Sequence, residues 1–138
     1  MKIERYTESD ESALLELMRC EGDEWACYHG DRYWERYRRA LEESITYVVR
    51  EEDRLCGFCR CRDDRGFGVY IYDLLVAAEA RGKGYGRCLM ERVCLDFPDD
   101  TVYVMSDVDV YYEKQGFRRE GSIFEVCLKA ERKPAPRP

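Results

Sequence analysis

The sequence predicts an α/β (α+β) fold with a mixed sheet, because stretches with a strand pattern and stretches with a helix pattern interleave along the chain. The clearest case runs from Val69 to Phe97. There a dense apolar run is followed by a glycine-rich turn and at once by a helical period. The 138 residues suffice for one hydrophobic core. No internal repeat or linker divides them, so a single domain is expected.

The first part of the chain predicts one strand and two helices. Lys2–Tyr6 alternates weakly and is expected to be a strand. Thr7 offers a hydroxyl N-cap to a helix whose first turn is acidic. Its apolar face is formed by Leu14, Leu15 and Met18. The segment Cys20–Gly30 is less regular, and a second helix is expected from about Asp31. One side of that helix carries Tyr33, Trp34, Tyr37 and Leu41.

Three strands are expected in the middle of the chain. Ile45–Glu51 and Leu55–Arg62 are joined by the polar turn Glu52-Asp53-Arg54. Asp63–Gly66 forms the next turn, and the strand Phe67–Val76 follows it. The helix after the glycine-rich turn presents its apolar face through Leu89, Met90, Val93, Cys94 and Phe97.

After this helix, Pro98-Asp99-Asp100 breaks the chain. Thr101–Met105 is then expected to be a strand, and Val108–Gln115 a short helix.

Two more strands are expected near the carboxyl end. One begins at Phe117–Arg119, and the last is Ile123–Lys129, after a turn at Glu120-Gly121-Ser122. The folded domain is expected to cover residues 1–130. Residues 131–138 contain three prolines and are expected to form a loose tail.

Composition and charge argue against several classes of protein. A net charge of −6 argues against nucleic acid as a partner, because phosphate binding needs a basic face. The charge leaves room for a cationic acceptor such as an amine, although it also serves solubility. No apolar run approaches the roughly 20 residues of a membrane span, so no membrane partner is expected. Met1–Arg5 lacks a signal-peptide pattern, so a cytoplasmic location is expected.

Eight cysteines are many for this length, and without a secretory pattern they indicate reduced thiols. The spacing of Cys56, Cys59 and Cys61 raises the alternative of a metal-binding structural protein. In a strand, however, Cys59 and Cys61 share one face and Cys56 points to the other. The only histidine is His29. Buried small hydrophobic side chains are therefore favoured, and no metal is expected.

The glycine-rich turn predicts a phosphate or pyrophosphate site. Three glycines in five positions expose the backbone to a ligand. The first amides of the following helix have no partner within the helix, and its dipole adds positive charge. The residues of this cofactor-binding stretch are Arg81, Gly82, Lys83, Gly84, Tyr85, Gly86 and Arg87.

The spacing excludes two common nucleotide motifs. G-x-G-x-x-G would need glycine at Arg87 or Leu89, and a P-loop would need Ser or Thr after Lys83. Arg81, Gly84 and Gly86 instead fit [Arg/Gln]-x-x-Gly-x-Gly, which resembles the pyrophosphate loop of GNAT-type N-acetyltransferases. Downstream, Tyr111-Tyr112-Glu113-Lys114-Gln115-Gly116-Phe117 resembles the aromatic-Tyr-Glu-Lys-x-Gly-Phe segment of that family. The resemblance covers roughly Ser44 to Lys129.

The resemblance implies a GNAT-like fold, in which helices flank a mostly antiparallel central sheet and the central strands splay apart to admit the pantetheine arm. It implies acetyl-coenzyme A as co-substrate, bound also by the main chain of Leu74, Leu75 and Val76. The expected reaction is direct transfer of the acetyl group to a primary amine, in a small molecule or a protein, within a ternary complex. Members of the family are often dimers, so a homodimer is one expected assembly.

The resemblance also implies roles for side chains. Tyr112 aligns with a tyrosine that protonates the departing thiolate, which a phenol can do at hydrogen-bond distance. One branch of the family has a glutamate base where this chain has Tyr70. Asp73 is the preferred base here. In regular alternation it shares a face with Val69, Ile71 and Leu75, and apolar neighbours would raise the pKa of its carboxyl.

Other candidates for these roles stay open. Glu24, Asp107 and Asp109 are further candidate bases, and the family's helper asparagine is absent or replaced by Ser106. Cys88, at the start of a helix, is a weaker candidate nucleophile because the only histidine is His29.

The segment between the first two helices is acidic and aromatic, and the resemblance places the acceptor pocket there. Glu24, Trp25 and Tyr28 would suit an ammonium group through charge and cation–π attraction. The alternative is that Trp25, Tyr33 and Trp34 simply pack into the core. For the whole chain, the alternative function is a non-catalytic sensor of acyl-coenzyme A.

Overall fold

The computed structural model describes residues 1–30 and 32–129. The chain forms two compact units, Met1–Met105 and Ser106–Pro138. The first unit contains the whole sheet, and the described part of the second contains one short helix. The expected tail at residues 131–138 lies outside the described residues, as does Asp31.

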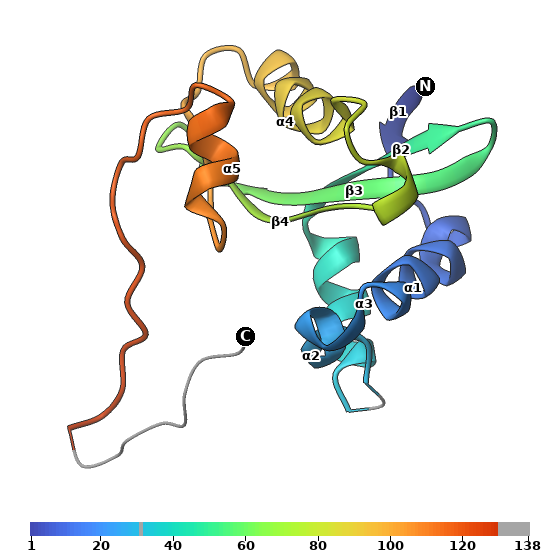
Figure 1. Ribbon diagram of the computed structural model, residues 1–138. Helices are drawn as coiled ribbons and strands as arrows, with labels where there is room; N and C mark the ends of the chain where they lie inside the picture. Colours follow the sequence, from blue (N-terminus) through green and yellow to red (C-terminus); the bar gives the residue numbers. More distant parts are fainter. Residues whose placement is uncertain (31, 130–138) are drawn as a thin grey trace. The chain divides into compact units, whose positions relative to one another are not determined.

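A five-stranded sheet in the order β1-β2-β3-β4-β5 forms the centre of the first unit (Figure 1). Its strands are β1 Lys2–Arg5, β2 Ile45–Glu51, β3 Arg54–Asp63, β4 Val69–Val76 and β5 Val102–Val104. The first four strands pair antiparallel, and β4 pairs with β5 in parallel. The mixed, mostly antiparallel sheet that the sequence predicts is thus confirmed.

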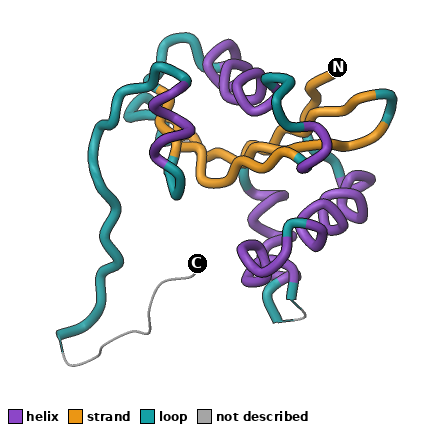
Figure 2. The backbone as a smooth tube through the Cα atoms, viewed as in Figure 1, coloured by secondary structure: helices purple, strands orange, loops and turns teal. Residues whose placement is uncertain are grey.

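Helices cover both faces of this sheet, with α4 on one side and α1, α2 and α3 on the other (Figures 1 and 2). The α-helices of the first unit are α1 Glu11–Cys20, α2 Ala26–His29, α3 Trp34–Glu43 and α4 Tyr85–Asp96. Short 3₁₀ turns lie at η1 Glu8–Asp10, η2 Gly22–Trp25 and η3 Ala78–Ala80. The second unit contains α5 Asp109–Lys114. Among the described residues, no helix combines the length and the apolar character that crossing a membrane requires.

The core fills the space between the sheet and the helices. Phe58, Val48, Leu14 and Met18 are fully buried on one side, and Leu89 and Val93 on the other. On α1, Leu17 is buried as well, whereas the expected Leu15 is half-buried. On α4, the expected Cys94 is exposed, so the apolar face of that helix is narrower than the sequence predicts.

Helix α3 and strand β4 begin later than the sequence predicts. Helix α3 begins at Trp34, because the carbonyl of Gly30 accepts hydrogen bonds from the amides of both Tyr33 and Trp34 and so closes a turn there. Strand β4 begins at Val69 because Phe67 lies in a turn in which its amide donates to the carbonyl of Asp64. The side chain of Phe67 is exposed.

The two strands expected near the carboxyl end are absent, since residues 117–128 form neither helix nor strand in the structure. Ile123, Phe124, Val126 and Leu128 are 70–85% exposed. An alternating apolar pattern makes a strand only when a neighbouring strand completes its hydrogen-bond ladder. The prediction of strands at Phe117–Arg119 and Ile123–Lys129 is therefore wrong for this structure.

Gly57 is a point where the sheet has no room for a side chain. A Cβ there would lie 2.9 Å from the carbonyl oxygen of Leu75 and 2.9 Å from a methyl group of Val49. We expect Gly57→Ala to lower the free energy of unfolding by about 2 kcal/mol, because the strands must shift to admit the methyl group. Urea denaturation measures the change. Gly121→Ala is the control, since nothing lies within 4 Å of a Cβ there, and equal stability of the two variants would contradict this account.

Candidate functional site

Strand β4 contains a bulge in its middle. Arg60 of β3 pairs with Asp73, and the next residue, Cys61, pairs with Ile71. Tyr72 is therefore an extra residue in β4 with no partner of its own in β3. A bulge of this kind changes the direction in which the following main-chain groups point.

Hydrogen bonds on either side of the bulge show this change. Before it, the amide of Val69 donates to Thr101 over 2.9 Å and the carbonyl of Ile71 accepts from Met105 over 2.9 Å, so both groups face β5. After it, the amide of Ala77 donates to Cys56 of β3 over 2.8 Å. Successive residues of a strand alternate in direction. The N–H groups of Leu74 and Val76 therefore point away from β3.

Strand β5 ends where these groups begin. It pairs with β4 only from Val69 to Ile71, and within the described part of the chain no strand pairs with β4 beyond that point on this side. The expected divergence of the central strands is thus seen between β4 and β5. In the described residues, no strand pairs with the N–H groups of Leu74 and Val76 on this side.

The glycine-rich turn connects β4 to α4 through η3 (Figure 1). Gly82 and Gly84 have φ values of +81° and +80°, a region that favours glycine. Nothing lies within 4 Å of a Cβ at either position, so the turn is open on this side. Gly84 is the N-cap of α4, and the amides of Tyr85, Gly86 and Arg87 form the first turn. The predicted phosphate site depends on these amides and on this open turn.

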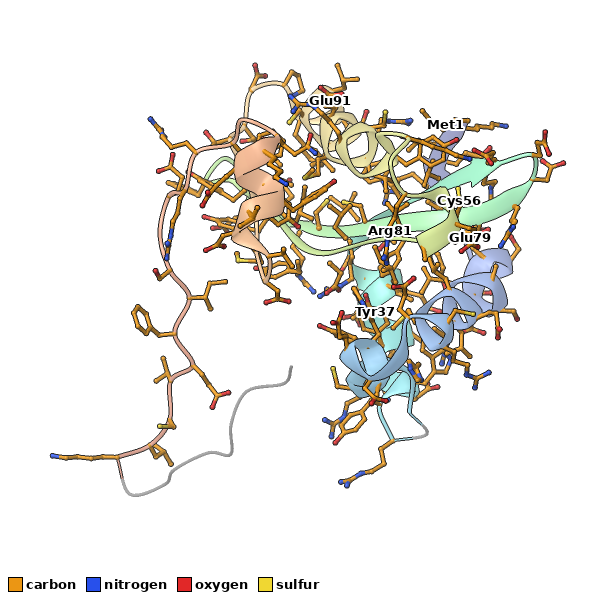
Figure 3. All side chains as sticks on the ribbon, in the orientation of Figure 1. Met1, Tyr37, Cys56, Glu79, Arg81 and Glu91 are labelled. Carbon is orange, nitrogen blue, oxygen red and sulfur yellow. The ribbon has the colours of Figure 1, made fainter. Side chains whose placement is uncertain are left out.

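The cations of this turn contact carboxylates, and two of these carboxylates come from distant parts of the sequence. Arg81 donates to Glu21 over 2.5 Å and to the carbonyl of Val76 over 3.0 Å (Figure 3). Lys83 lies 3.0 Å from a carboxylate oxygen of Glu51. Arg87 lies 3.3 Å from Glu91. Glu21 and Glu51 were not apparent from the sequence, because nothing local distinguishes them from other surface acids.

Glu51 also fixes the start of α4. The hydroxyl of Tyr85 donates to its carboxylate. This hydrogen bond, with a smaller effect of burial, raises the pKa of Tyr85 to about 12. The same bond and the ammonium group of Lys83 lower the pKa of Glu51. Glu51 is thus held as a carboxylate beside the turn.

Asp73 lies in a polar environment rather than among apolar neighbours. Its Oδ2 accepts from Nε of Arg60 over 2.6 Å and from the hydroxyl of Tyr37 over 2.7 Å. The expectation of an apolar environment is therefore wrong. The bulge also places Asp73 on the opposite face from Val69 and Ile71, because paired residues share a face and Asp73 pairs with Arg60. Burial and the charge of Asp73 raise the pKa of Tyr37 well above its ordinary value.

The aromatic residues of the acceptor segment form a connected cluster. The ring of Trp25 lies 5.2 Å from that of Tyr28 and 6.0 Å from that of Phe58. Tyr28 in turn lies 4.8 Å from Tyr37. Trp25 and Tyr28 are half-buried, and Glu24 is exposed beside them. Trp25 thus packs on Phe58 but stays half-buried, and Tyr33 is 41% exposed.

Tyr112 lies on α5 in the second unit, on the short helix that the sequence predicts. It is half-buried, and its ring lies edge-on to that of Tyr111 at 5.0 Å. Ser106 donates to Asp109 over 2.7 Å, which ties the residue before the helix to its first turn. Gly116 ends the helix with a φ of +83°. The structure thus collects the turn and the end of β4 in one unit and Tyr112 in the other.

The cysteines are dispersed. In the described residues, none of the eight forms a disulfide and no group of three or more His, Cys, Asp or Glu side chains is arranged to bind a metal ion. Cys56, Cys59 and Cys61 are buried. Burial raises the pKa of the Cys59 thiol well above its ordinary value and that of Cys61 to about 11. Such thiols stay protonated and serve as small hydrophobic groups.

Comparison with known proteins bears on this arrangement. A family model described as "Acetyltransferase (GNAT) domain" matches residues 42–119. The chain is 29% identical over 91 residues to a protein of Porphyra purpurea named "Uncharacterized N-acetyltransferase ycf52", covering 59% of this chain and 52% of that protein. It is 33% identical over 95 residues to "Serotonin N-acetyltransferase 2, chloroplastic" of Oryza sativa subsp. japonica, covering 64% and 46%. The chain thus spans about half the length of these curated relatives.

Solved structures match most of the chain. An aminoglycoside acetyltransferase from an uncultured soil metagenomic sample superposes with a TM-score of 0.69 at 22% identity, covering 93% of this chain and 98% of that one. A GNAT family acetyltransferase from Streptococcus pneumoniae gives a TM-score of 0.69 at 22% identity, with coverage of 94% and 98%. At this identity the likeness shows the fold alone.

Proposed function

The chain belongs to the GNAT acetyltransferase family, and on that premise we propose that it transfers the acetyl group of acetyl-coenzyme A directly to a primary amine in a ternary complex. One observation carries the proposal: the N–H groups of Leu74 and Val76, which no strand pairs in the described residues, lead into the open, cationic turn at the start of α4. An extended ligand with a pyrophosphate at one end and amides along its length matches this arrangement.

The residues of the turn fit the phosphates of coenzyme A. The first amides of α4, together with Arg81, Lys83 and Arg87, supply donors of the kind that bind pyrophosphate. Gly82 and Gly84 leave room for close approach to the backbone. The phosphates would compete with Glu21 for Arg81 and with Glu51 for Lys83. Leu74, Leu75 and Val76 would hold the pantetheine arm through the main chain.

The chemistry needs few groups from the protein. The amine nitrogen forms a bond to the thioester carbon, the carbon–sulfur bond breaks, one proton leaves the nitrogen and one reaches the sulfur. Main-chain N–H groups of Leu74 and Val76 would stabilise the charge on the carbonyl oxygen; such a donor contributes roughly 3 kcal/mol. We assign the protonation of the sulfur to Tyr112. Asp73 is held by Arg60 and Tyr37, so it is better suited to positioning than to accepting the proton of the amine. The remaining candidate bases are Glu24, Asp107 and Asp109.

We propose a primary amine in a small molecule or a protein as the acceptor, with Glu24, Trp25 and Tyr28 at its site. The exposed carboxylate beside half-buried aromatic rings supports this, because both attract an ammonium group. The names of two similar proteins specify amine-bearing acceptors, serotonin and an aminoglycoside. A cytoplasmic location and a homodimer are further expectations, which cell fractionation and light scattering would test.

Thermal unfolding with added ligands tests the proposed donor. Acetyl-coenzyme A and coenzyme A at 100 times their dissociation constants are expected to stabilise the protein by about 2.7 kcal/mol, because they bind only the folded state. NAD and ATP at the same concentrations are the controls and are expected to have little effect. A shift with NAD but none with coenzyme A would contradict the proposed donor. Mass spectrometry of a panel of amines incubated with acetyl-coenzyme A then identifies the acceptor class.

A further inference from the structure

A buried polar cluster surrounds the bulge of β4. Arg60, whose side chain is 14% exposed, pairs with Asp73 over 2.6 Å and donates to the hydroxyl of Ser44 over 3.1 Å. Tyr37 of α3 donates to the same oxygen of Asp73. The guanidinium of Arg60 also lies 5.5 Å from the ring centre of Tyr72 and 5.6 Å from that of Tyr37. We call Tyr37, Arg60 and Asp73 the clamp.

The clamp acts on the bulge itself. Tyr72 is the extra residue of β4, Asp73 follows it, and Arg60 is the residue of β3 opposite them. Arg60 contacts both bulge residues. It forms an ion pair with Asp73, and its guanidinium lies over the ring of Tyr72. Tyr37 approaches from the face of the sheet that α1, α2 and α3 cover, so α3 is also connected to the bulge (Figures 1 and 3). A strand without this extra residue would not direct both Tyr72 and Asp73 toward Arg60.

The bulge decides which amides are available to a ligand. Shifting a strand by one residue exchanges the groups that face each neighbour. If β4 lost its bulge while Ile71 stayed paired with β5, the amides of Asp73 and Leu75 would face outward and those of Leu74 and Val76 would face β3. Buried ion pairs are best known for fixing such registers rather than for adding stability.

We propose that the clamp fixes the bulge of β4 and that Tyr37 and Arg60 are thereby positioning residues for acetyl transfer. The consequence for catalysis rests on the proposed function, whereas the effect on register does not. In this proposal, Asp73 helps to orient the main-chain amides that follow it in β4. It assigns no proton transfer to this carboxylate.

Amide hydrogen exchange tests the register directly. In the wild type, the amides of Leu75 and Ala77 are expected to exchange slowly, and those of Leu74 and Val76 fast. The double variant Arg60→Met/Asp73→Leu replaces the buried pair with apolar groups of similar size, so folding is retained. We expect this variant to lose the alternation between slowly and rapidly exchanging amides along the end of β4. Its kcat should fall by about 10- to 100-fold while its melting temperature stays close to that of the wild type.

A milder pair of variants tests the same proposal if the double variant does not fold. Tyr37→Phe removes one hydrogen bond to Asp73 and is expected to speed exchange of the Leu75 amide by about tenfold. Tyr47→Phe is the matched control, because Tyr47 donates to Asp96 over 2.7 Å on the other face of the sheet. It should leave the exchange of Leu75 unchanged.

The results separate the two proposals. The proposal that the clamp fixes the bulge is overturned by either of two results. One is wild-type alternation of amide exchange in the double variant, and the other is equal exchange of the Leu75 amide in Tyr37→Phe and Tyr47→Phe. Absence of acetyl-coenzyme A binding by the wild type overturns the proposed function, while the exchange pattern still decides the clamp. Arg60→Lys keeps the charge beside Asp73, so it is expected to retain part of the alternation of amide exchange that the double variant loses.

Discussion

Replacing Gly84 with glutamate is expected to abolish the binding of acetyl-coenzyme A. The φ of +80° at Gly84 places a Cβ in a conformation that costs about 1–2 kcal/mol. The added carboxylate also lies at the start of α4, where the amides and cations that would hold phosphate converge. Together these effects should raise the dissociation constant of coenzyme A at least about 100-fold, which is a loss of about 2.8 kcal/mol of binding free energy. Titration calorimetry with coenzyme A measures the loss.

Gly66→Glu provides a matched control for this variant. Gly66 also has a positive φ, +97°, and nothing lies within 4 Å of a Cβ there. It lies in the turn that precedes β4, whereas the cationic turn follows that strand. The control therefore shares the backbone strain and the added charge but not the location. Equal loss of binding in both variants would show a general effect of strain, and unchanged binding in Gly84→Glu would place the phosphates elsewhere.

The features that were predictable from the sequence are those that depend on neighbouring residues. The glycine-rich turn has its conformation because Gly82 and Gly84 permit positive φ, and α4 starts directly after it. Strand β2 agrees with its predicted range at both ends, and the predicted polar turn at Glu52-Asp53 follows it directly. The short helix that carries Tyr112 is likewise encoded locally and ends at Lys114, two residues before Gly116.

The bulge was not predictable, because it depends on the partner strand. Regular alternation places Asp73 with Ile71, yet Tyr72 is inserted between them and Asp73 faces Arg60 instead. The partners of Asp73 are 13 and 36 residues away in the sequence. No periodicity within β4 contains that information. The mistaken environment of Asp73 follows from this single extra residue.

The expected carboxyl-terminal strands show the reverse case, in which a local pattern exists without its partner. Ile123, Val126 and Leu128 have the composition of a strand, but they stay exposed in the structure. Pairing is a property of two strands and not of one. Glu21 and Glu51 were missed for a related reason, since their contacts with Arg81 and Lys83 join distant segments.

Tyr112→Phe is expected to lower kcat by about 100-fold at saturating amine, because general acid catalysis contributes that much or more. The hydroxyl would act on a charge that develops only as the carbon–sulfur bond breaks, so its removal should affect kcat and not the binding of the donor. The dissociation constant of acetyl-coenzyme A should stay within about twofold, since the aromatic ring remains. Stopped-flow turnover and calorimetry on the same preparation measure the two quantities.

Tyr111→Phe is the control for this prediction, since Tyr111 lies next to Tyr112 on α5 with ring centres 5.0 Å apart. Removing its hydroxyl makes the same chemical change on the same helix and should leave kcat unaltered. A fall in kcat in both variants would indicate a disturbed helix rather than a lost proton donor. Donor binding without turnover in the wild type would instead identify a sensor of acyl-coenzyme A. A wild-type rate in Tyr112→Phe would mean that another donor protonates the thiolate, because the sulfur must gain a proton from some group when the bond breaks.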